Sequence, residues 1–400
     1  MNVLFLSIGS INHIEDKGIY TDLLRQFREN SHCVYVVSSR EKRTEMPTEY
    51  KKENGIHILK VRIGNITKNN KFEKGISTIR IEGQFLRAIK QYLGEVKFDL
   101  VIYSTPPITF EKVINYIKKR DDAKSYLLLK DIFPQNAVDL NMFSRSSVIY
   151  KYFRWKEKRL YKVSDYIGCM SQANIDFLLE HNTKISASSL EICPNSIDPI
   201  AIIKDENKIN LTRNQYNIPT DKTVFIYGGN LGKPQGIDFL IQCLQANKNN
   251  KQAFFIIAGS GTEFAKLKAY FDKEQPMNAQ LYEELPLEEY ERLVNACDVG
   301  LIFLDYRFTI PNFPSRLLAY MEATMPVLAA TDANTDIGKV IENGHFGLWC
   351  ESNNVSQFNQ KLEQLHEQEV REAMGKNARA YLEQNYTAKH SYEIIMSHFE

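Results

Sequence analysis

The amino-acid sequence predicts an α/β protein made of two domains, each built on a parallel sheet. Short apolar runs that suit buried strands alternate with longer segments whose apolar residues recur at helical spacing. The chain has 400 residues, which is enough for two separate hydrophobic cores. Glycines and other small residues follow several of the apolar runs, at the positions where open parallel sheets bind ligands.

The composition excludes several classes of protein. Lys and Arg number 50 against 49 Asp and Glu, and this formal net charge of +1 argues against a general nucleic-acid binder. The six cysteines are scattered, mostly in apolar runs and without a Cys-x-x-Cys pair, which favours buried free thiols in a reducing compartment. The N-terminus does not resemble a signal peptide, and no apolar run approaches membrane-spanning length. We therefore expect a cytoplasmic protein.

The chain begins with a predicted β-α-β unit. Residues 3–8 form an apolar run, residues 19–29 have helical spacing, and residues 33–37 form the next apolar run. The first loop has one glycine where a dinucleotide-binding fingerprint needs three, so a classical NAD site is excluded here. Gly18 still permits a ligand to approach the backbone at the start of the helix.

The next part of the first half adds strands and two open questions. Strands are predicted at residues 56–61, 100–103 and 126–129, and a helix at 79–93. A basic segment holding Arg62, Lys68, Lys71 and Lys74 is interpreted as a solvated loop, with contact to an anionic acceptor or membrane as the alternative. Asp131 follows the strand at 126–129, so it either contacts a ligand or caps the next turn.

A basic, aromatic segment at residues 147–163 precedes the last strands of this half. Packing of one helix face on the sheet explains its pattern, and contact with an anionic bilayer is the alternative. Strands at 166–170 and 190–193 complete the sheet, and residues 194–198 mark the exit from the first domain.

The second half contains the better candidate for a phosphate site. An apolar strand at 223–227 leads into a glycine-rich loop at 228–237 that holds Lys233, and a helix follows. Backbone N–H groups of such a loop can bind phosphate, although the spacing is not that of a Walker loop. A flexible surface lysine is the alternative interpretation.

The same β-loop-α pattern repeats to the end of the chain. Strands are predicted at 254–258, 279–282, 299–304 and 327–330, a helix at 287–297, and the sheet region ends with 338–349. Between the last two strands, Pro314 is predicted to open a helix whose first turn carries Arg316. An arginine there opposes the helix dipole, so a bound anion is one explanation and an ordinary surface arginine the other. Three helices are predicted at 355–366, 370–384 and 390–399.

Five short motifs resemble those of the retaining glycosyltransferases of family 4, which have the two-domain GT-B fold. They are DIFPQNAVD at 131–139, PNSID at 194–198, GGNLGKPQG at 228–236, AGSG at 258–261 and NFPSR at 312–316. The chain looks closest to the branch that transfers N-acetylated sugars such as N-acetylfucosamine in bacterial O-antigen and capsule assembly. The resemblance implies an acceptor-binding Rossmann-like domain at 1–200, a nucleotide-sugar-binding domain at 201–385 across a cleft, and a helix at 386–400 returning to the first domain.

The resemblance also implies roles for individual residues. Lys233 would pair with the donor diphosphate, Arg316 would hold phosphate, and Asp131 would touch the donor sugar or the reacting centre; these three are the predicted catalytic residues. The predicted donor-binding residues are Gly18, Gly229, Asn230, Lys233, Gly259, Leu285, Asn312, Phe313, Pro314, Ser315 and Arg316. The chain departs from the family where a pair of glutamates is usual, because Pro311 and Ala319 stand there.

The implied activity is metal-independent transfer of a sugar, with retained configuration, from a UDP-sugar to a polyprenyl-diphosphate-linked saccharide. No cofactor and no metal site are expected, and peripheral contact with the inner face of the cell membrane is left open. The alternatives are a nucleotide-sugar epimerase or hydrolase of the same fold, and a catalytically silent binding subunit.

Overall fold

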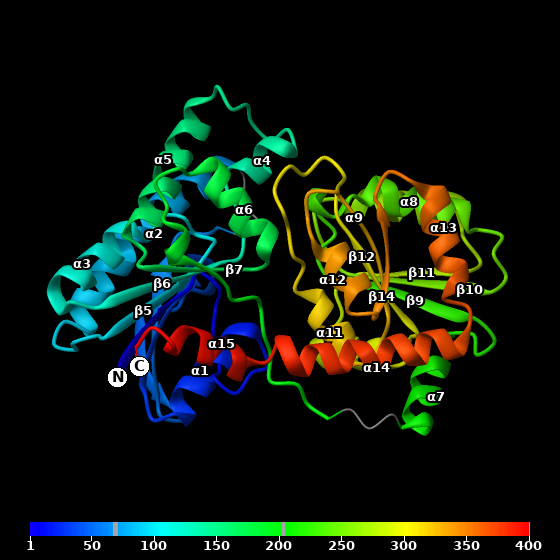
Figure 1. The fold of residues 1–400 in the computed structure, drawn as a ribbon, viewed down its shortest axis with the longest axis horizontal. Helices are drawn as coiled ribbons and strands as arrows, with labels where there is room; N and C mark the ends of the chain where they lie inside the picture. Colours follow the sequence, from blue (N-terminus) through cyan, green and yellow to red (C-terminus); the bar gives the residue numbers. More distant parts are fainter. Residues whose placement is uncertain (67–70, 202–204, 400) are drawn as a thin grey trace. The chain divides into compact units, whose positions relative to one another are not determined.

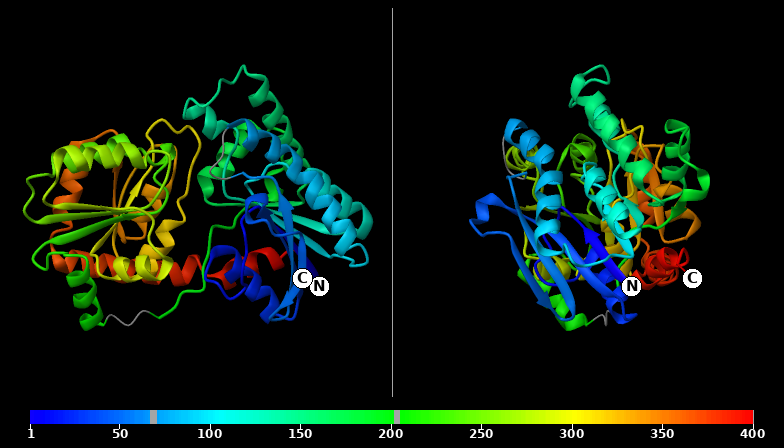
Figure 2. Two further views of the ribbon diagram at one scale, coloured as in Figure 1. Left: turned by 180° about the vertical axis from the view of Figure 1, so that it is seen from behind. Right: turned by 90° about the vertical axis from the view of Figure 1, so that its left-hand side faces the viewer.

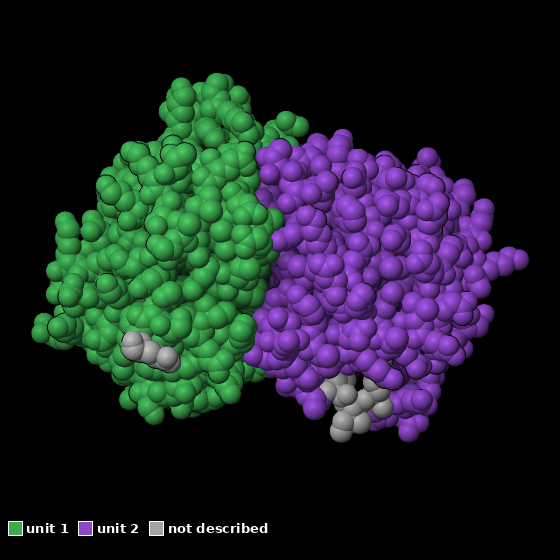
Figure 3. Space-filling model, in the orientation of Figure 1, with its two compact units in different colours: residues 1–198, 388–400 green, residues 199–387 purple. Residues whose placement is uncertain are grey.

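The computed structural model describes residues 1–66, 71–201 and 205–399 of the chain. The chain divides into two compact units, which Figure 3 shows in different colours. Unit 1 comprises Met1–Asp198 together with Ala388–Glu400, and unit 2 comprises Pro199–Thr387. Each unit is an α/β domain around a parallel sheet, so the predicted fold class is confirmed.

Unit 1 contains an eight-stranded sheet in the order β3-β4-β2-β1-β5-β6-β7-β8. Its strands are β1 (Asn2–Leu6), β2 (Cys33–Glu41), β3 (Glu49–Glu53), β4 (Ile56–Ile63), β5 (Leu100–Ser104), β6 (Lys124–Leu129), β7 (Tyr166–Cys169) and β8 (Leu190–Ile192). All neighbours pair in parallel except β3, which is antiparallel to β4 at the edge. Strand β3 was not predicted, because its residues are polar and carry no apolar alternation.

Helices cover both faces of this sheet (Figures 1 and 2). They are α1 (Ile19–Glu29), α2 (Lys71–Tyr92), α3 (Glu111–Asp121), α4 (Gln135–Asp139), α5 (Val148–Val163), α6 (Gln172–His181) and α15 (Ala388–Met396). Helices α1 and α15 pack together, and Ile395 shares a core with Leu23 and Phe27. Helix α2 begins at Lys71, so the predicted loop was wrong for Lys71 and Lys74. The prediction missed this first part of the helix because Gly75, Ser77 and Thr78 have low helix propensity; Lys68 lies outside the described residues.

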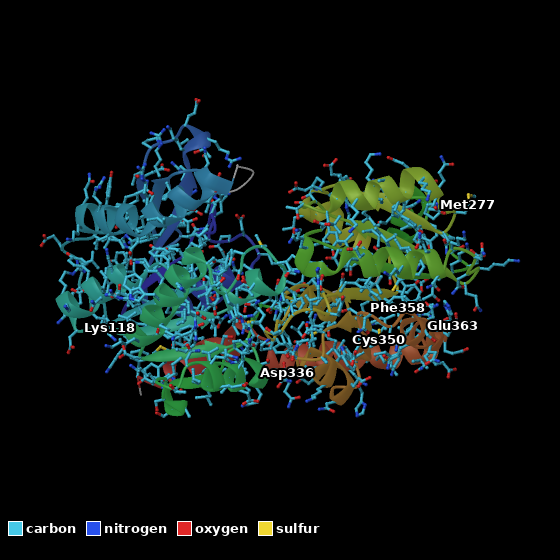
Figure 4. All side chains as sticks on the ribbon, turned by 90° about the horizontal axis from the view of Figure 1, so that it is seen from above. Lys118, Met277, Asp336, Cys350, Phe358 and Glu363 are labelled. Carbon is cyan, nitrogen blue, oxygen red and sulfur yellow. The ribbon has the colours of Figure 1, made fainter. Side chains whose placement is uncertain are left out.

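Unit 2 contains a six-stranded sheet in the order β11-β10-β9-β12-β13-β14, with all neighbours parallel. Its strands are β9 (Thr223–Gly228), β10 (Ala253–Ala258), β11 (Ala279–Tyr282), β12 (Val299–Phe303), β13 (Val327–Thr331) and β14 (Gly347–Glu351). Strands buried on both faces need continuous apolar runs, and these are the runs that made the strands predictable. The core includes Cys350 and Phe358, which Figure 4 labels.

The helices of unit 2 also lie on both faces of its sheet, with α8, α9 and α13 on one face and α11 and α14 on the other (Figure 1). They are α7 (Glu206–Gln215), α8 (Ile237–Ala246), α9 (Phe264–Glu274), α10 (Leu287–Asn295), α11 (Arg316–Glu322), α12 (Ile337–Asn343), α13 (Val355–Gln364) and α14 (Gln368–Asn385). The prediction that Pro314 occupies the first helical turn was wrong. Helix α11 begins at Arg316 with Ser315 as its N-cap, because a tight turn precedes it, in which the N–H of Leu317 donates to the Pro314 carbonyl.

All six cysteines are unpaired, and four of them are buried. Within the described ranges, no helix combines the length and the apolar character needed to cross a membrane.

Candidate active site

The loops that follow β9 and β10 are joined by backbone contacts. The N–H of Gly229 donates to the carbonyl of Ala258 at 2.9 Å, and the N–H of Leu231 donates to that of Ser260 at 2.9 Å. Gly259 has φ +157°, and a Cβ added to it would lie 1.8 Å from the Gly229 carbonyl oxygen. This close approach requires glycine. The two glycine loops therefore form one rigid edge at the carboxyl ends of adjacent strands.

The loop that carries Lys233 is fixed by its own polar groups. The Oε1 atom of Gln235 accepts hydrogen bonds from Asn230 Nδ2 at 3.1 Å and from the N–H of Gly232 at 3.2 Å. The N–H of Asp305, just after β12, donates to the Pro234 carbonyl at 2.9 Å. Lys233 itself is exposed and forms no ion pair within the described part of unit 2. A fixed loop thus presents a free cation to solvent.

Arg316, at the start of α11, lies against this edge. Its guanidinium sits over the ring of Tyr227, 4.2 Å from the ring centroid, and a Cβ added to Gly229 would lie 3.7 Å from its Nη2 atom. Its Nη1 atom is buried and has no hydrogen-bond partner in the described structure. A buried donor without a partner is costly, so a ligand atom that accepts from Nη1 would stabilise the arrangement.

Three tyrosines, Tyr227, Tyr290 and Tyr320, surround the guanidinium, and none of them was among the predicted site residues. Tyr320 is fully buried, and its single O–H group is shared between the carbonyls of Ile226 and Leu301, each 3.2 Å away. The same hydroxyl oxygen accepts from the N–H of Gly228 at 3.3 Å. A Cβ on Gly228 would lie 1.9 Å from the hydroxyl of Tyr290.

Burial is the main influence on the ionisation of these tyrosines. It raises the pKa of Tyr290 to about 12, against a smaller lowering by the nearby Arg316. Burial also raises the pKa of Tyr227 and of Tyr320. All three rings stay neutral at physiological pH, so they enclose the Arg316 cation without neutralising it.

The remaining predicted residues of unit 2 lie on neighbouring loops. Leu285 is half-buried after β11, and Phe313 is buried with its ring 6.2 Å from that of Tyr386. The carbonyl of Asn312 accepts a hydrogen bond from Thr335 Oγ1 at 2.8 Å, which fixes the backbone of this loop. Pro314 and Ser315 form the turn before α11.

The two glutamates that are usual in the family are absent here, and the next acidic residue, Glu322, does not take their place. Pro311 and Ala319 cannot accept a hydrogen bond through a side chain. Glu322 is buried, and its Oε1 atom accepts from the N–H of Ile200 at 3.0 Å. Glu322 therefore anchors the chain that enters unit 2, and a sugar hydroxyl would have to compete with this bond.

The last two predicted residues, Gly18 and Asp131, lie in unit 1. The N–H of Gly18 donates to Asp22 Oδ1 at 3.0 Å, so this amide is already paired. Asp131 lies two residues after the end of β6, and its N–H donates to Thr105 Oγ1 at 3.2 Å. Burial raises the pKa of its carboxyl group. Pro134 is the N-cap of the following helix α4, so the alternative role of Asp131 as that cap is not observed.

The structure thus gathers Gly229, Asn230, Lys233, Gly259 and Arg316 at one edge of the unit 2 sheet. Gly18 and Asp131 belong to the other unit. Of the three missed tyrosines, Tyr320 stands four residues after Arg316 on one helix face, a spacing that could have revealed it.

The known proteins that this chain is similar to are described as glycosyltransferases. Residues 208–381 match the family described as glycosyl transferases group 1. A relative from Pseudomonas aeruginosa, described as the probable glycosyltransferase WbjE, is 25% identical over 330 residues, covering 82% of this chain and 80% of the relative.

Two solved structures share the fold over nearly the whole chain. WaaG, described as a glycosyltransferase involved in lipopolysaccharide biosynthesis, has a TM-score of 0.66 at 15% identity and covers 98% of this chain and 99% of its own. HepE from Anabaena, solved in complex with UDP and glucose, has a TM-score of 0.71 at 14% identity. The match covers 100% of this chain and 99% of the HepE chain. Residues 208–381, which lie in unit 2, are therefore similar to the glycosyl transferases group 1, and the whole chain shares the two-domain fold of these solved structures.

Proposed function

We propose that the protein transfers a sugar from a UDP-sugar to a lipid-diphosphate-linked saccharide in the synthesis of a bacterial surface polysaccharide. The transfer retains the anomeric configuration and needs no metal. The proposed transferred sugar is N-acetylated, such as the N-acetylfucosamine suggested by the sequence motifs. The UDP bound in HepE and the involvement of WaaG in lipopolysaccharide biosynthesis support this choice of donor and product class.

The observation that carries the proposal is the environment of Arg316. A guanidinium held on a neutral ring, with one buried N–H group lacking a partner, is suited to an anionic ligand. Lys233 stands free on the loop that also holds Gly229, whose backbone borders Arg316. Together these groups present two cations to a diphosphate at the carboxyl ends of parallel strands.

The proposed chemistry follows from this charge. Breaking the bond between the sugar and the diphosphate develops negative charge on the leaving oxygen, and fixed cations stabilise that charge. Arg316 and Lys233 supply the positive charge that a metal provides in other enzymes. With retention, the leaving phosphate can take the proton of the acceptor hydroxyl. Asp131, whose pKa is raised by burial, is proposed to orient the sugar or the acceptor.

The test is turnover with a panel of UDP-sugars, with and without a lipid-linked acceptor. Arg316→Ala and Lys233→Ala are each expected to lower turnover at least about tenfold while leaving the circular dichroism unchanged. Matched controls are Arg292→Ala and Lys248→Ala, which remove exposed cations of the same unit. Wild-type kinetics in both site variants would contradict the proposal.

The same panel separates the two alternative functions. Rapid conversion of the donor without any acceptor favours an epimerase or hydrolase. Tight UDP binding without conversion of any donor favours a silent binding subunit.

We also propose peripheral contact with an anionic membrane through the surface around α5. Its exposed apolar residues are Met142, Val148, Ile149 and Trp155, with Val148 81% exposed. Exposed cations stand among them at Arg145, Lys151, Lys158 and Lys162, whereas Glu157 is buried against Arg154. Apolar and basic residues together are typical of surfaces that bind anionic bilayers.

Sedimentation with vesicles tests this contact. Binding to vesicles that contain anionic lipid, and its loss in an Ile149→Ser, Trp155→Ser double variant, is the expected result. Equal sedimentation of the variant would contradict the role of this surface.

A further inference from the structure

The loop that follows β13 holds the segment between β12 and α11 at two points. That segment, drawn in yellow in Figure 1, contains the predicted donor-binding residues from Asn312 to Ser315. The carbonyl of Phe308 accepts a hydrogen bond from Asn334 Nδ2, and the carbonyl of Asn312 accepts one from Thr335 Oγ1 at 2.8 Å. An asparagine and a threonine outside the predicted site therefore hold the backbone within it.

Asp332 fixes the turn from which both of these side chains reach the segment. It is the first residue after β13 and is 2% exposed. Its Oδ1 atom accepts hydrogen bonds from the N–H of Asn334 at 2.9 Å and from the N–H of Thr335 at 3.0 Å. Bonds from an aspartate to the backbone two or three residues further on stabilise a tight turn. One carboxylate oxygen thus sets the backbone of both residues that hold the segment.

The turn is tied to the sheet where it begins. Thr331, the last residue of β13, is fully buried. Its Oγ1 atom accepts from Trp349 Nε1, on β14, at 2.8 Å and donates to the Asp332 carbonyl at 3.0 Å. The N–H of Ser352 donates to the Thr331 carbonyl at 2.9 Å. A continuous set of hydrogen bonds therefore runs from the core of unit 2 to the segment before α11.

These bonds decide where one backbone N–H group points. The peptide bond between Asn312 and Phe313 is trans, and in a trans peptide the carbonyl and the N–H point in opposite directions. Because the Asn312 carbonyl faces Thr335, the N–H of Phe313 points away from the loop after β13. This N–H has no hydrogen-bond partner within residues 1–66, 71–201 and 205–399. It therefore needs water or a ligand as its acceptor.

We propose that Asp332, Asn334 and Thr335 are positioning residues for sugar transfer. Asp332 shapes the turn, the other two side chains hold the carbonyls of the segment, and the segment thereby directs the Phe313 N–H toward an oxygen atom of the donor. The inference rests on the proposed function, because that oxygen belongs to the donor diphosphate or to the transferred sugar. A donor group that is held in place before the reaction stabilises developing charge without having to reorganise.

The first test compares Thr335→Val, which removes the hydroxyl, with Thr212→Val as the matched control. Thr335 is 6% and Thr212 8% exposed, and Thr212 Oγ1 also donates to a carbonyl, that of Lys208, at 2.9 Å. Thr335→Val is expected to lower kcat/KM for the UDP-sugar at least about fivefold, and Thr212→Val to leave it within about twofold. Thermal melting checks that both variants are folded. Equal kcat/KM in the two variants would overturn the proposal.

Rescue by a conservative variant separates positioning from packing. Thr335→Ser restores the hydroxyl donor while leaving out the methyl group, so its kcat/KM should stay within about twofold of the wild type. A loss in Thr335→Ser as large as that in Thr335→Val would assign Thr335 to packing and overturn its positioning role.

A double variant releases both carbonyls of the segment. Asn334 is exposed, so Asn334→Ala removes its bond to Phe308 without opening the core. Combined with Thr335→Val it is expected to lower kcat/KM at least about tenfold. Hydrogen exchange of the peptide spanning 308–315 should become at least about threefold faster, with exchange in α7 unchanged. Unchanged exchange in the double variant would overturn the proposal, because other contacts would then hold the segment.

Calorimetric titration with UDP and with UDP-N-acetylglucosamine identifies the oxygen that the Phe313 N–H meets. Weaker binding of both probes in Thr335→Val assigns it to the diphosphate, and weaker binding of UDP-N-acetylglucosamine alone assigns it to the sugar. Equal affinity for both probes, together with unchanged kcat/KM, would overturn the positioning role. Exchange and titration do not depend on turnover. A wild type that binds UDP but transfers no sugar would therefore contradict the proposed function and still leave the positioning role testable by these two measurements.

Discussion

The guanidinium of Arg316 rests on the ring of Tyr227, with 4.2 Å between its central carbon and the ring centroid. The two residues come from different elements, α11 and β9. The hydroxyl of Tyr227 donates to the Asn230 carbonyl at 2.8 Å, so the ring is fixed to the same loop that carries Lys233. Tyr227 therefore links the positions of the two cations proposed to bind the diphosphate.

Replacement of Tyr227 by Leu should weaken UDP binding. A cation–π contact is worth about 0.5–2 kcal/mol, which corresponds to roughly 2- to 30-fold in affinity. Tyr227→Phe keeps the ring and loses one hydrogen bond, so its UDP affinity should stay within about twofold of wild type while stability falls by about 1 kcal/mol. Calorimetric titration and thermal melting measure the two effects. Equal affinities in the Leu and Phe variants would contradict the positioning role.

The Arg316→Lys variant should not retain the activity of the wild type. Lysine keeps the charge but lacks the planar fork that stacks on a ring while donating from a second nitrogen. We expect Arg316→Lys to lose more than about tenfold in kcat/KM for the UDP-sugar, close to Arg316→Ala. Recovery of wild-type kinetics in the lysine variant would show that charge alone suffices.

Gly259→Ala should destabilise unit 2. Its Cβ would lie 1.8 Å from the Gly229 carbonyl, so the two loops must separate, at an expected cost of about 2–4 kcal/mol. Gly83, exposed in α2 with open space around it, is the matched control, and Gly83→Ala should stabilise by about 0.5–1 kcal/mol.

Denaturant unfolding measures these two changes. Trp155 and Trp349 are the two tryptophans of the chain and lie in unit 1 and unit 2 respectively, so a Trp155→Phe background leaves Trp349 to report on unit 2 alone. An unchanged midpoint for unit 2 in Gly259→Ala would contradict the need for glycine.

The fold was predictable where burial on both strand faces left an apolar run in the sequence. Strands such as β9 and β10 were found for this reason. Strand β3 was missed because an edge strand with polar side chains has no such signal. Helix α11 was predicted to start at Pro314, because proline is common in a first turn, but a local turn delays the regular helix to Arg316.

The site was predictable only in those parts that are local in sequence. Gly229 and Lys233 share one loop, and Arg316 follows a strand, so loop chemistry singled them out. Tyr290 reaches Gly228 from α10, a contact set by tertiary packing. The burial of Lys130, the first residue after β6, likewise depends on Cys193, Asn195 and Ser391, which are distant along the chain. The proposed roles of Asp131, Lys233 and Arg316 remain predictions.

The charge on Lys130 should make stability depend on pH in a defined window. Burial lowers its pKa from an ordinary value of 10.5 to about 8. Between these two values the unfolded chain holds a proton that the folded chain has released, so this group makes folding more favourable as the pH rises. Its contribution is complete above the unfolded value and is lost as the pH falls through about 8.

Melting curves of wild type and Lys130→Met from pH 7 to 10.5 isolate this contribution, because the other titrating groups are common to both proteins. The variant should melt higher than wild type near pH 7, and the difference should shrink steadily toward pH 10.5. Lys124→Met, which removes an exposed lysine of the same strand, should show no such trend. A difference that stays constant across this range would mean that Lys130 is protonated in the folded chain throughout, and that a counter-ion already accompanies it.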